Sequence, residues 1–281
     1  MNRRNFIAKT IGSFAAIGAG TALYAWQIEP RWLEIVQVDM PIKNLPPSLV
    51  GKTLMQISDL HVGKRFNPSF VIKSLQKAAA LKPDFVAYTG DYITLTNNEV
   101  DYQALEQVLT NAVKGTLGTV GILGNHDYGT AWQQDDVADN VTERLTRHGI
   151  QVLRNKTAVV NGLQFIGFDD YWGTQFNPTA AFANYQNTLP TIALCHNPDV
   201  CDLPVWPNFQ SWILSGHTHG GQVKPPFLPA PLLPVKNKKY AAGKILLDGD
   251  RTLYINRALG HLWQVRFNVR PEITLFQLQQ A

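Results

Sequence analysis

The sequence predicts one α/β domain built in layers, and two features of the chain support this fold class. From Thr53 onward, short apolar runs of strand length alternate with segments whose apolar residues recur at helical spacing. Five of the apolar runs lead directly into short polar motifs. Strands and helices that alternate along a chain pack as layers, and ligands of such domains gather at the carboxyl ends of the strands.

The composition is that of a globular protein. Of the 281 residues, 45% are hydrophobic and only 16% are charged, so the chain can bury a substantial core. The formal net charge of +4 is spread over several segments, whereas a nucleic-acid-binding protein normally carries a denser basic stripe. Nucleic acid is therefore not an expected partner. Two cysteines, Cys195 and Cys201, are too few for a disulfide framework, and a buried thiol is the favoured interpretation of Cys195.

Residues 1–28 have the layout of a twin-arginine signal or an N-terminal anchor. Arg3 and Arg4 precede an uncharged stretch, Ile11 to Trp26, that is rich in Gly and Ala. A soluble amphipathic helix is the alternative, but this stretch has almost no polar face. Its 16 residues are slightly few for a membrane-spanning helix, and its cleavage or retention as an anchor is left open.

This signal predicts a location and a partner. The twin-arginine translocation machinery would carry the protein across the bacterial cytoplasmic membrane, to the periplasm or cell wall side, or leave it anchored there. The same machinery transports proteins in the folded state. Residues 29–281 would then form the catalytic domain.

Each predicted strand is followed by a polar motif. In chain order the strands are 53–58, 85–89, 119–123, 191–195 and 211–215. The motifs that follow them are Asp59-Leu60-His61, Gly90-Asp91, Gly124-Asn125-His126-Asp127, His196-Asn197-Pro198-Asp199 and Gly216-His217-Thr218-His219. Because strand ends converge in layered α/β folds, these scattered motifs should meet in space.

Helices are predicted between the strands. Asn67 and Pro68 offer the N-cap and first turn of a helix that runs through Lys82. Further helices are predicted at 100–113, at 135–148 with a stop at Gly149, and near 179–187. Asn161-Gly162 between two apolar runs predicts a β-hairpin, at which the chain should change sheets.

The motifs contain seven side chains of the kinds that bind transition metals. They are Asp59, His61, Asp91, Asn125, His196, His217 and His219. Seven nitrogen and oxygen ligands exceed the needs of one ion but serve two divalent cations, such as Mn, Zn or Fe, if one carboxylate bridges them. Asp91, alone on its strand after a glycine, is the natural bridge.

Two such cations a few ångströms apart clamp a phosphate and activate a bridging hydroxide, so no protein nucleophile is needed. The leaving oxygen still benefits from a proton. His126 follows the ligand Asn125 and is not needed for coordination, so it is the predicted general acid, with Asp127 or another carboxylate orienting its ring.

In this order, the five motifs resemble the calcineurin-like metallophosphoesterase superfamily. Further segments are similar to its bacterial YkuE/YaeI-type branch, namely Ser58 to His61, Gly216 to Gln222, Tyr240 to Gly243 and Arg270 to Ile273. The resemblance implies a four-layer α/β/β/α sandwich of two mixed sheets flanked by helices. It also implies one metal held by Asp59, His61, Asp91 and His219, and a second held by Asp91, Asn125, His196 and His217.

The leading functional hypothesis is an exported phosphoesterase that hydrolyses phosphodiester, phosphomonoester or pyrophosphate bonds. Its expected partner is a phosphorylated small molecule or lipid, including lipid-linked or envelope phosphates such as UDP-diacylglucosamine. A non-catalytic envelope-binding module whose metals only stabilise the fold is one alternative. A cytoplasmic nuclease is another, but it would need a basic groove and no export signal.

Three features outside the motifs are given structural interpretations. His148 lies at a helix end before Gly149, where imidazoles commonly interact with the last carbonyls. His261 is interpreted as a packed loop histidine. The proline-rich stretch Pro225 to Pro234 is slightly favoured as a rigid packed connection over a loop that dips into a membrane.

Overall fold

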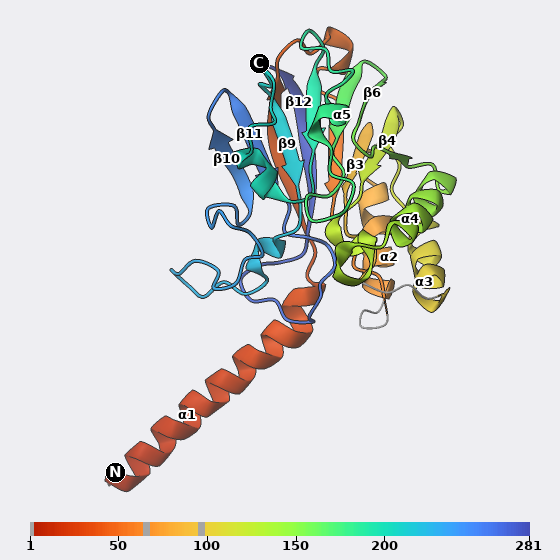
Figure 1. The fold of residues 1–281 in the computed structure, drawn as a ribbon. Helices are drawn as coiled ribbons and strands as arrows, with labels where there is room; N and C mark the ends of the chain where they lie inside the picture. The colour runs from red at the N-terminus through yellow and green to blue at the C-terminus, as the bar shows by residue number, and fades with distance from the viewer. Residues whose placement is uncertain (1–2, 64–67, 95–98) are drawn as a thin grey trace.

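The computed structural model describes residues 3–63, 68–94 and 99–281, and its strands form two six-stranded sheets (Figure 1). The first sheet has the order β1-β12-β2-β3-β4-β5. Its strands are β1 (Glu34–Ile42), β2 (Thr53–Ile57), β3 (Phe85–Thr89), β4 (Gly118–Ile122), β5 (Gln151–Val152) and β12 (Glu272–Gln280). Strands β2 to β5 run parallel, whereas β12 is antiparallel to β2 and parallel to β1.

The second sheet has the order β10-β11-β9-β8-β7-β6. Its strands are β6 (Lys156–Val160), β7 (Leu163–Gly167), β8 (Thr191–Leu194), β9 (Trp212–Ser215), β10 (Gly243–Leu247) and β11 (Arg251–Ile255). Strands β7, β8, β9 and β11 are parallel, and β6 and β10 pair antiparallel at the two edges. All five predicted motif-bearing strands are therefore present, and both sheets are mixed.

The predicted hairpin at Asn161-Gly162 is confirmed. Both residues have positive φ, 44° and 87°, as a tight two-residue turn between β6 and β7 requires. Because β5 belongs to the first sheet and β6 to the second, the chain changes sheets just before this hairpin.

Three helices cover the outer face of the first sheet (Figure 1). They are α2 (Pro68–Ala79), α3 (Glu99–Leu109) and α4 (Asp135–Arg147). Their apolar faces pack with one side of β2 and β3 in a core that includes Val71, Leu105 and Val141. The proposed cap at Asn67 lies outside the described residues.

A second core lies between the two sheets, where Leu54, Phe85, Phe165 and Leu214 meet. On the outer face of the second sheet a third core lies beneath loops and the single-turn helix α5 (Pro178–Ala181). The α/β sandwich fold is thus confirmed, but the helix predicted near 179–187 is short. After this turn, at its C-cap, Phe182 packs against Phe168 and Phe209.

The N-terminal segment projects from the domain as one long helix (Figure 1). The α-helix α1 (Arg3–Leu23) has no buried residue and is followed by a π-helical turn, Tyr24–Ile28, and a 3-10 turn, Glu29–Arg31. Together they make 29 helical residues that are long and apolar enough to cross a membrane, a property that signal sequences share. The helix is thus longer than the uncharged stretch from Ile11 to Trp26 suggested.

Candidate metal centre

The loops that carry the five motifs meet at one end of the sandwich. Buried polar side chains tie the strand ends together: the Gln56 side-chain amide on β2 donates to Thr89 Oγ1 on β3 at 3.0 Å and to the Ser215 carbonyl on β9 at 2.9 Å. The carboxylate of Asp59 accepts the backbone N–H of His217 at 3.1 Å. These bonds join the two sheets at the point where both supply motif residues.

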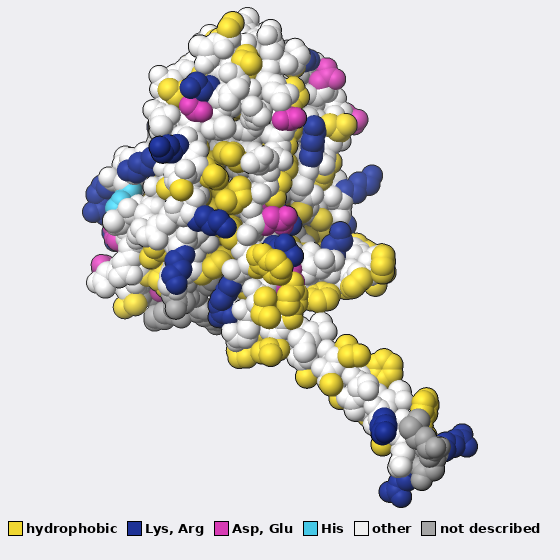
Figure 2. Space-filling model, turned by 180° about the vertical axis from the view of Figure 1, so that it is seen from behind, with side chains coloured by type: hydrophobic (Ala, Val, Ile, Leu, Met, Phe, Trp, Pro, Cys, Tyr) yellow, Lys and Arg dark blue, Asp and Glu magenta, His cyan; other side chains and the backbone are white. Residues whose placement is uncertain are grey.

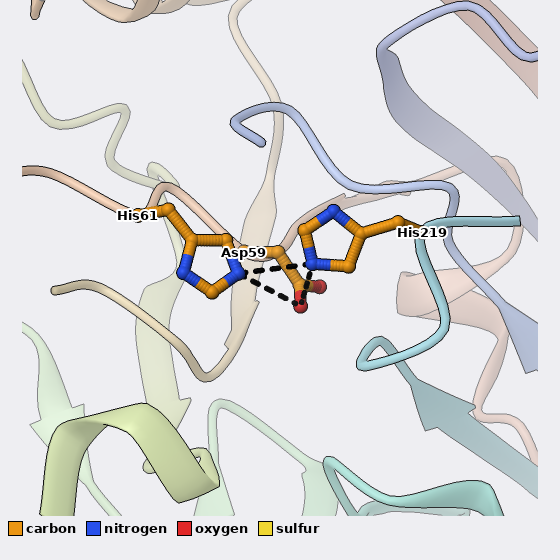
Figure 3. A group of neighbouring side chains, drawn as sticks. All are labelled: Asp59, His61 and His219. Atoms are coloured by element: carbon orange, nitrogen blue, oxygen red, sulfur yellow. Dashed lines mark hydrogen bonds and ion pairs between the residues drawn. The ribbon is translucent and has the colours of Figure 1, made fainter. Parts of the chain in front are cut away.

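One cluster joins Asp59, His61 and His219 (Figure 3). The Nε2 atoms of the two imidazoles lie 2.9 Å apart. Asp59 Oδ1 is 3.3 Å from His219 Nε2 and 3.8 Å from His61 Nε2. All three side chains are buried and point at one another, although they come from loops that follow different sheets.

Asp91 joins this cluster to a second one. Its Oδ2 lies 3.1 Å from His196 Nε2 and 3.5 Å from His61 Nε2. Asp91, His196 and His217 form a group whose candidate ligand atoms lie within 4.8 Å of one another, as do those of His61, Asp91 and His126. Asp91 therefore sits between the two sets of imidazoles.

Hydrogen bonds to the far ring nitrogens hold two of these imidazoles in a defined orientation. His196 Nδ1 donates to the Thr89 carbonyl at 2.7 Å, which turns its Nε2 toward Asp91. His217 Nε2 donates to the Pro234 carbonyl at 2.9 Å, which leaves its Nδ1 available. Metal-binding histidines commonly donate their other N–H to a carbonyl in this way.

Asn125 is the remaining predicted ligand. It is buried at the end of β4, and the next backbone N–H, of His126, donates to Asp91 Oδ1 at 2.9 Å. Within the described residues, Asn125 Oδ1 and His219 Nδ1 are buried without a hydrogen-bond partner. Buried carboxylates, imidazole lone pairs and an orphaned amide oxygen at one point are the chemistry that a pair of divalent cations requires.

The backbone at the ligands is unusual. Asp59, His61, Asp91, His217 and His219 all have φ between 48° and 71°, in the left-handed region that L-residues rarely adopt. Such strain persists only where the surroundings impose it, and it is common at functional sites.

Close backbone approach explains one of the flanking glycines. A Cβ on Gly124 would lie 2.6 Å from the Asp91 backbone nitrogen and 2.8 Å from Asp91 Cγ. Glycine is therefore required there for Asp91 to keep its place.

The electrostatics favour cations. Burial raises the pKa of Asp59, but the neighbouring His219 and His196 together lower it, to about 2. Burial likewise raises the pKa of Asp91, which His196 and His126 bring well below its usual range. Burial lowers the pKa of His217 to about 3. Two carboxylates thus stay ionised beside imidazoles of which some stay neutral, so the site combines negative charge with free lone pairs.

His126 lies at the edge of this centre. Its ring meets the His61 ring edge to face, with centroids 4.9 Å apart. Burial lowers the pKa of His126 below the usual value of 6.5, against the raising effect of Asp91. The ring is close enough to act on a group held at the centre, as the general-acid prediction requires.

Asp127 is engaged elsewhere. Its two carboxylate oxygens accept four backbone N–H groups, those of Asp91, Tyr92, Ile93 and Gly124, at 2.8 to 3.2 Å. Among the described residues, His126 Nδ1 has no hydrogen-bond partner, so no such bond links the ring to Asp127. The carboxylate supports the loops after β3 and β4, and its predicted action on His126 stays a prediction.

Sequence reasoning missed one residue at this site, Asp170. Asp170 is buried after β7; its Oδ1 accepts the backbone N–H groups of Trp172 and Gly173, and burial raises its pKa to about 7. The Trp172 ring stands 4.5 Å from the His217 ring, edge to face. Asp169-Asp170 follows a buried strand as the other motifs do, and this signal could have identified it.

The three features that were given structural interpretations differ in how well the structure supports them. His148 Nε2 pairs with Glu106 Oε2 at 2.6 Å, so it ties α4 to α3 rather than capping carbonyls. His261 is buried, as a packed loop residue would be. The packed-connection interpretation of Pro225 to Pro234 is wrong for its tip, because Phe227 is fully exposed and Leu232 is 79% exposed.

Comparisons with known proteins agree with this geometry. A family model described as calcineurin-like phosphoesterase matches residues 52–221. The chain is 32% identical to the metallophosphoesterase YkuE of Bacillus subtilis, over 100% of this chain and 99% of that one. It is 29% identical to phosphodiesterase YaeI of Escherichia coli, over 99% of both chains. It is 27% identical to UDP-2,3-diacylglucosamine pyrophosphatase LpxG of Chlamydia muridarum, over 97% and 98%.

Proposed function

Since the chain belongs to the calcineurin-like phosphoesterase family and is a metal-dependent phosphoester hydrolase, we propose that it acts with two divalent cations on phosphate esters or anhydrides outside the cytoplasm. The observation that carries this proposal is the position of Asp91, which belongs to two of the three buried ligand groups. The non-catalytic alternative is disfavoured, because the chain has enzymes among its relatives and three groups of candidate metal ligands close together.

We assign the ligands as two sets that share Asp91. Asp59, His61 and His219 would complete the first site, and Asn125, His196 and His217 the second. Bound cations would supply Lewis acidity, which offsets the charge of the phosphate oxygens and activates water. Mn, Zn and Fe all suit these donors.

The side chains of this protein would then orient the substrate and supply a proton to the leaving group. His126 is assigned to protonate the leaving oxygen. Because burial lowers the pKa of His126, its protonated form depends on nearby negative charge, and an arriving anionic phosphate supplies that charge as Asp91 does.

An activity assay tests the assignment. Purified protein is supplied with Mn or Zn and bis-p-nitrophenyl phosphate, and wild type is compared with Asp91→Asn and His126→Ala. We expect both variants to lose at least about a hundredfold in kcat, the usual contribution of a positioned acid or of a charge-stabilising group. Asp139→Asn and His148→Ala, which lie away from the centre, are the matched controls. Equal rates in all five proteins would sink the proposal.

For the substrate we propose a lipid-linked or envelope phosphate, with UDP-diacylglucosamine as the first compound to test. Two observations support this choice: a relative of similar length is named for its pyrophosphatase activity on that compound, and the chain carries an apolar N-terminal helix. Release of a nucleoside monophosphate from UDP-diacylglucosamine is compared with its release from a panel of soluble nucleotide sugars. This comparison decides between lipid-linked and soluble substrates.

We also propose export or anchoring through residues 1–28, with the domain on the periplasm or cell wall side and with the twin-arginine translocation machinery as a partner. Arg3 and Arg4 lie at the exposed start of α1, where a receptor can reach them. Cell fractionation of an Arg3→Lys/Arg4→Lys variant should show cytoplasmic retention. An unchanged distribution would remove this part of the proposal.

A further inference from the structure

An apolar groove runs away from the metal centre. It has a volume of about 660 Å³ and begins at His217 and His219. Its two walls come from the loops at 231–234 and 262–265, and Leu232 and Trp263 stand at its outer end with 79% and 74% of their surfaces exposed. A surface of this kind next to a polar centre indicates a binding site rather than packing.

Both walls are fixed to the loop that carries the histidines. On one side, the Pro234 carbonyl accepts the His217 Nε2–H, and the Leu232 carbonyl would lie 2.9 Å from a Cβ on Gly221, so the loop packs closely there. On the other side, the Gln222 side-chain amide donates to the carbonyls of Trp263 and Val265, each at 3.0 Å. These contacts therefore hold both walls of the groove in place.

These hydrogen bonds also determine which ligands the groove can bind. The polar groups at the groove's edge bond to one another, so apolar side chains supply most of the lining. A peptide would leave its own N–H and C=O groups without partners in such a groove, whereas a hydrocarbon chain has none to satisfy.

The outer end of the groove lies where α1 joins the domain. Arg266 N donates to the Ala25 carbonyl at 2.9 Å, and the Gln264 amide donates to the Trp26 carbonyl at 3.1 Å. Phe227, at the tip of the proline-rich loop, lines a cavity together with Tyr24 of the π-helical turn. Figure 2 shows hydrophobic side chains gathered around this junction.

We propose that the groove binds the hydrocarbon chain of an amphiphilic phosphate ester whose phosphate lies at the metal centre. The inference rests on the proposed function, because it takes the centre as the place where the phosphate reacts. An apolar α1 at the outer end of the groove brings that end to a bilayer surface, from which a chain enters with little exposure to water. Substrate selection is then partly a matter of chain length.

A homologous substrate series tests this inference. p-Nitrophenyl phosphodiesters with ethyl, butyl, hexyl and octyl groups are offered below the concentrations at which they form micelles, to full-length protein in nanodiscs of fixed lipid content. The readout is the octyl-to-ethyl ratio of kcat/KM. In Leu232→Ser/Trp263→Ser this ratio should fall about fifteenfold from wild type, the contribution of roughly two buried methylenes at about fourfold each.

Leu246→Ser is the matched control, because Leu246 on β10 is 76% exposed and does not line the groove. Partition of the esters into the disc is the same for every protein, so only a groove effect separates the variants. The control should keep the wild-type ratio.

The outcomes separate the two proposals. If no ester is hydrolysed, the proposed function is wrong. If the esters are hydrolysed but the octyl-to-ethyl ratio of kcat/KM is equal in all three proteins, the groove inference is wrong, and the groove then holds a second copy of this chain or another occupant. If the double variant does not fold, an octyl phosphonate with a terminal diazirine is photolysed with wild type. Labelling within 231–234 or 262–265 supports the inference, and labelling elsewhere overturns it.

Discussion

Replacing Asp127 with asparagine separates two roles for this carboxylate. In the structure, Asp127 Oδ1 accepts the N–H groups of Tyr92 and Ile93, and Oδ2 accepts those of Asp91 and Gly124. An asparagine keeps the shape but has one acceptor oxygen. Its NH2 group would face two of the four backbone donors, which are buried and cannot turn to water.

The magnitude follows from the number of donors that lose a partner. A buried N–H without an acceptor costs about 1–3 kcal/mol, so two of them cost roughly 2–6 kcal/mol. For a domain of this size the midpoint of thermal unfolding should fall by roughly 5–20 °C. Activity should fall as well, because the loop that holds Asp91 loses its support.

Calorimetry of Asp127→Asn beside wild type measures this effect, with Asp139→Asn as the control. Asp139 is 71% exposed and pairs with Arg154 at the surface, so its loss should cost at most about 1 kcal/mol. A midpoint equal to that of the control, together with a large loss of kcat, would refute the reasoning. Asp127 would then act on His126, as the sequence suggested.

Three further outcomes are expected. Chelation should abolish activity and lower the unfolding midpoint, and added Mn or Zn should restore both, because cations stabilise the folded state that binds them; an unchanged midpoint would count against a resident metal. Gly124→Ala should weaken metal binding at least about tenfold in equilibrium dialysis, because its Cβ would displace Asp91; unaltered binding would contradict the close approach. Burial raises the pKa of Glu106, but hydrogen bonds from His148 and Arg144 outweigh this effect, so the pKa lies below its usual value of 4.5. A carboxyl group whose pKa is lower in the folded than in the unfolded protein stabilises the fold at pH values above the unfolded pKa. The difference in melting temperature between wild type and Glu106→Gln should therefore be present at pH 7 and close as the pH falls below 4.5. A difference that persists in acid would refute this pH dependence.

Much of the fold could be predicted because its strands are short apolar runs with turn residues at their ends. The segments from Thr53 to Ile57 and from Phe85 to Thr89 are almost wholly buried, so most of their side chains are apolar and the strands are easy to recognise. Strand β1, at a sheet edge, was not predicted, although from Gln37 to Ile42 its exposed residues alternate with half-buried and buried ones.

The candidate site was predictable to a similar degree and for a related reason. Only a few residue types bind such metals, here aspartate, asparagine and histidine, and each ligand has to follow a strand that brings it to the shared edge. These two demands leave a pattern in the sequence, which is why Asp59, Asp91 and His196 stand out. Trp172 leaves no such pattern, because a tryptophan beside a histidine ring is a matter of contact alone.

The sequence by itself therefore determined the kinds of ligand, their order and the class of reaction, since these depend on side-chain chemistry and on strand ends. Only the tertiary structure decided that Asp127 supports two loops and that an apolar groove leads from His217 to Trp263. Both facts depend on segments far apart in the chain. Hydrogen-bond partners and groove walls are set by distances in space, and local residue patterns carry no record of them.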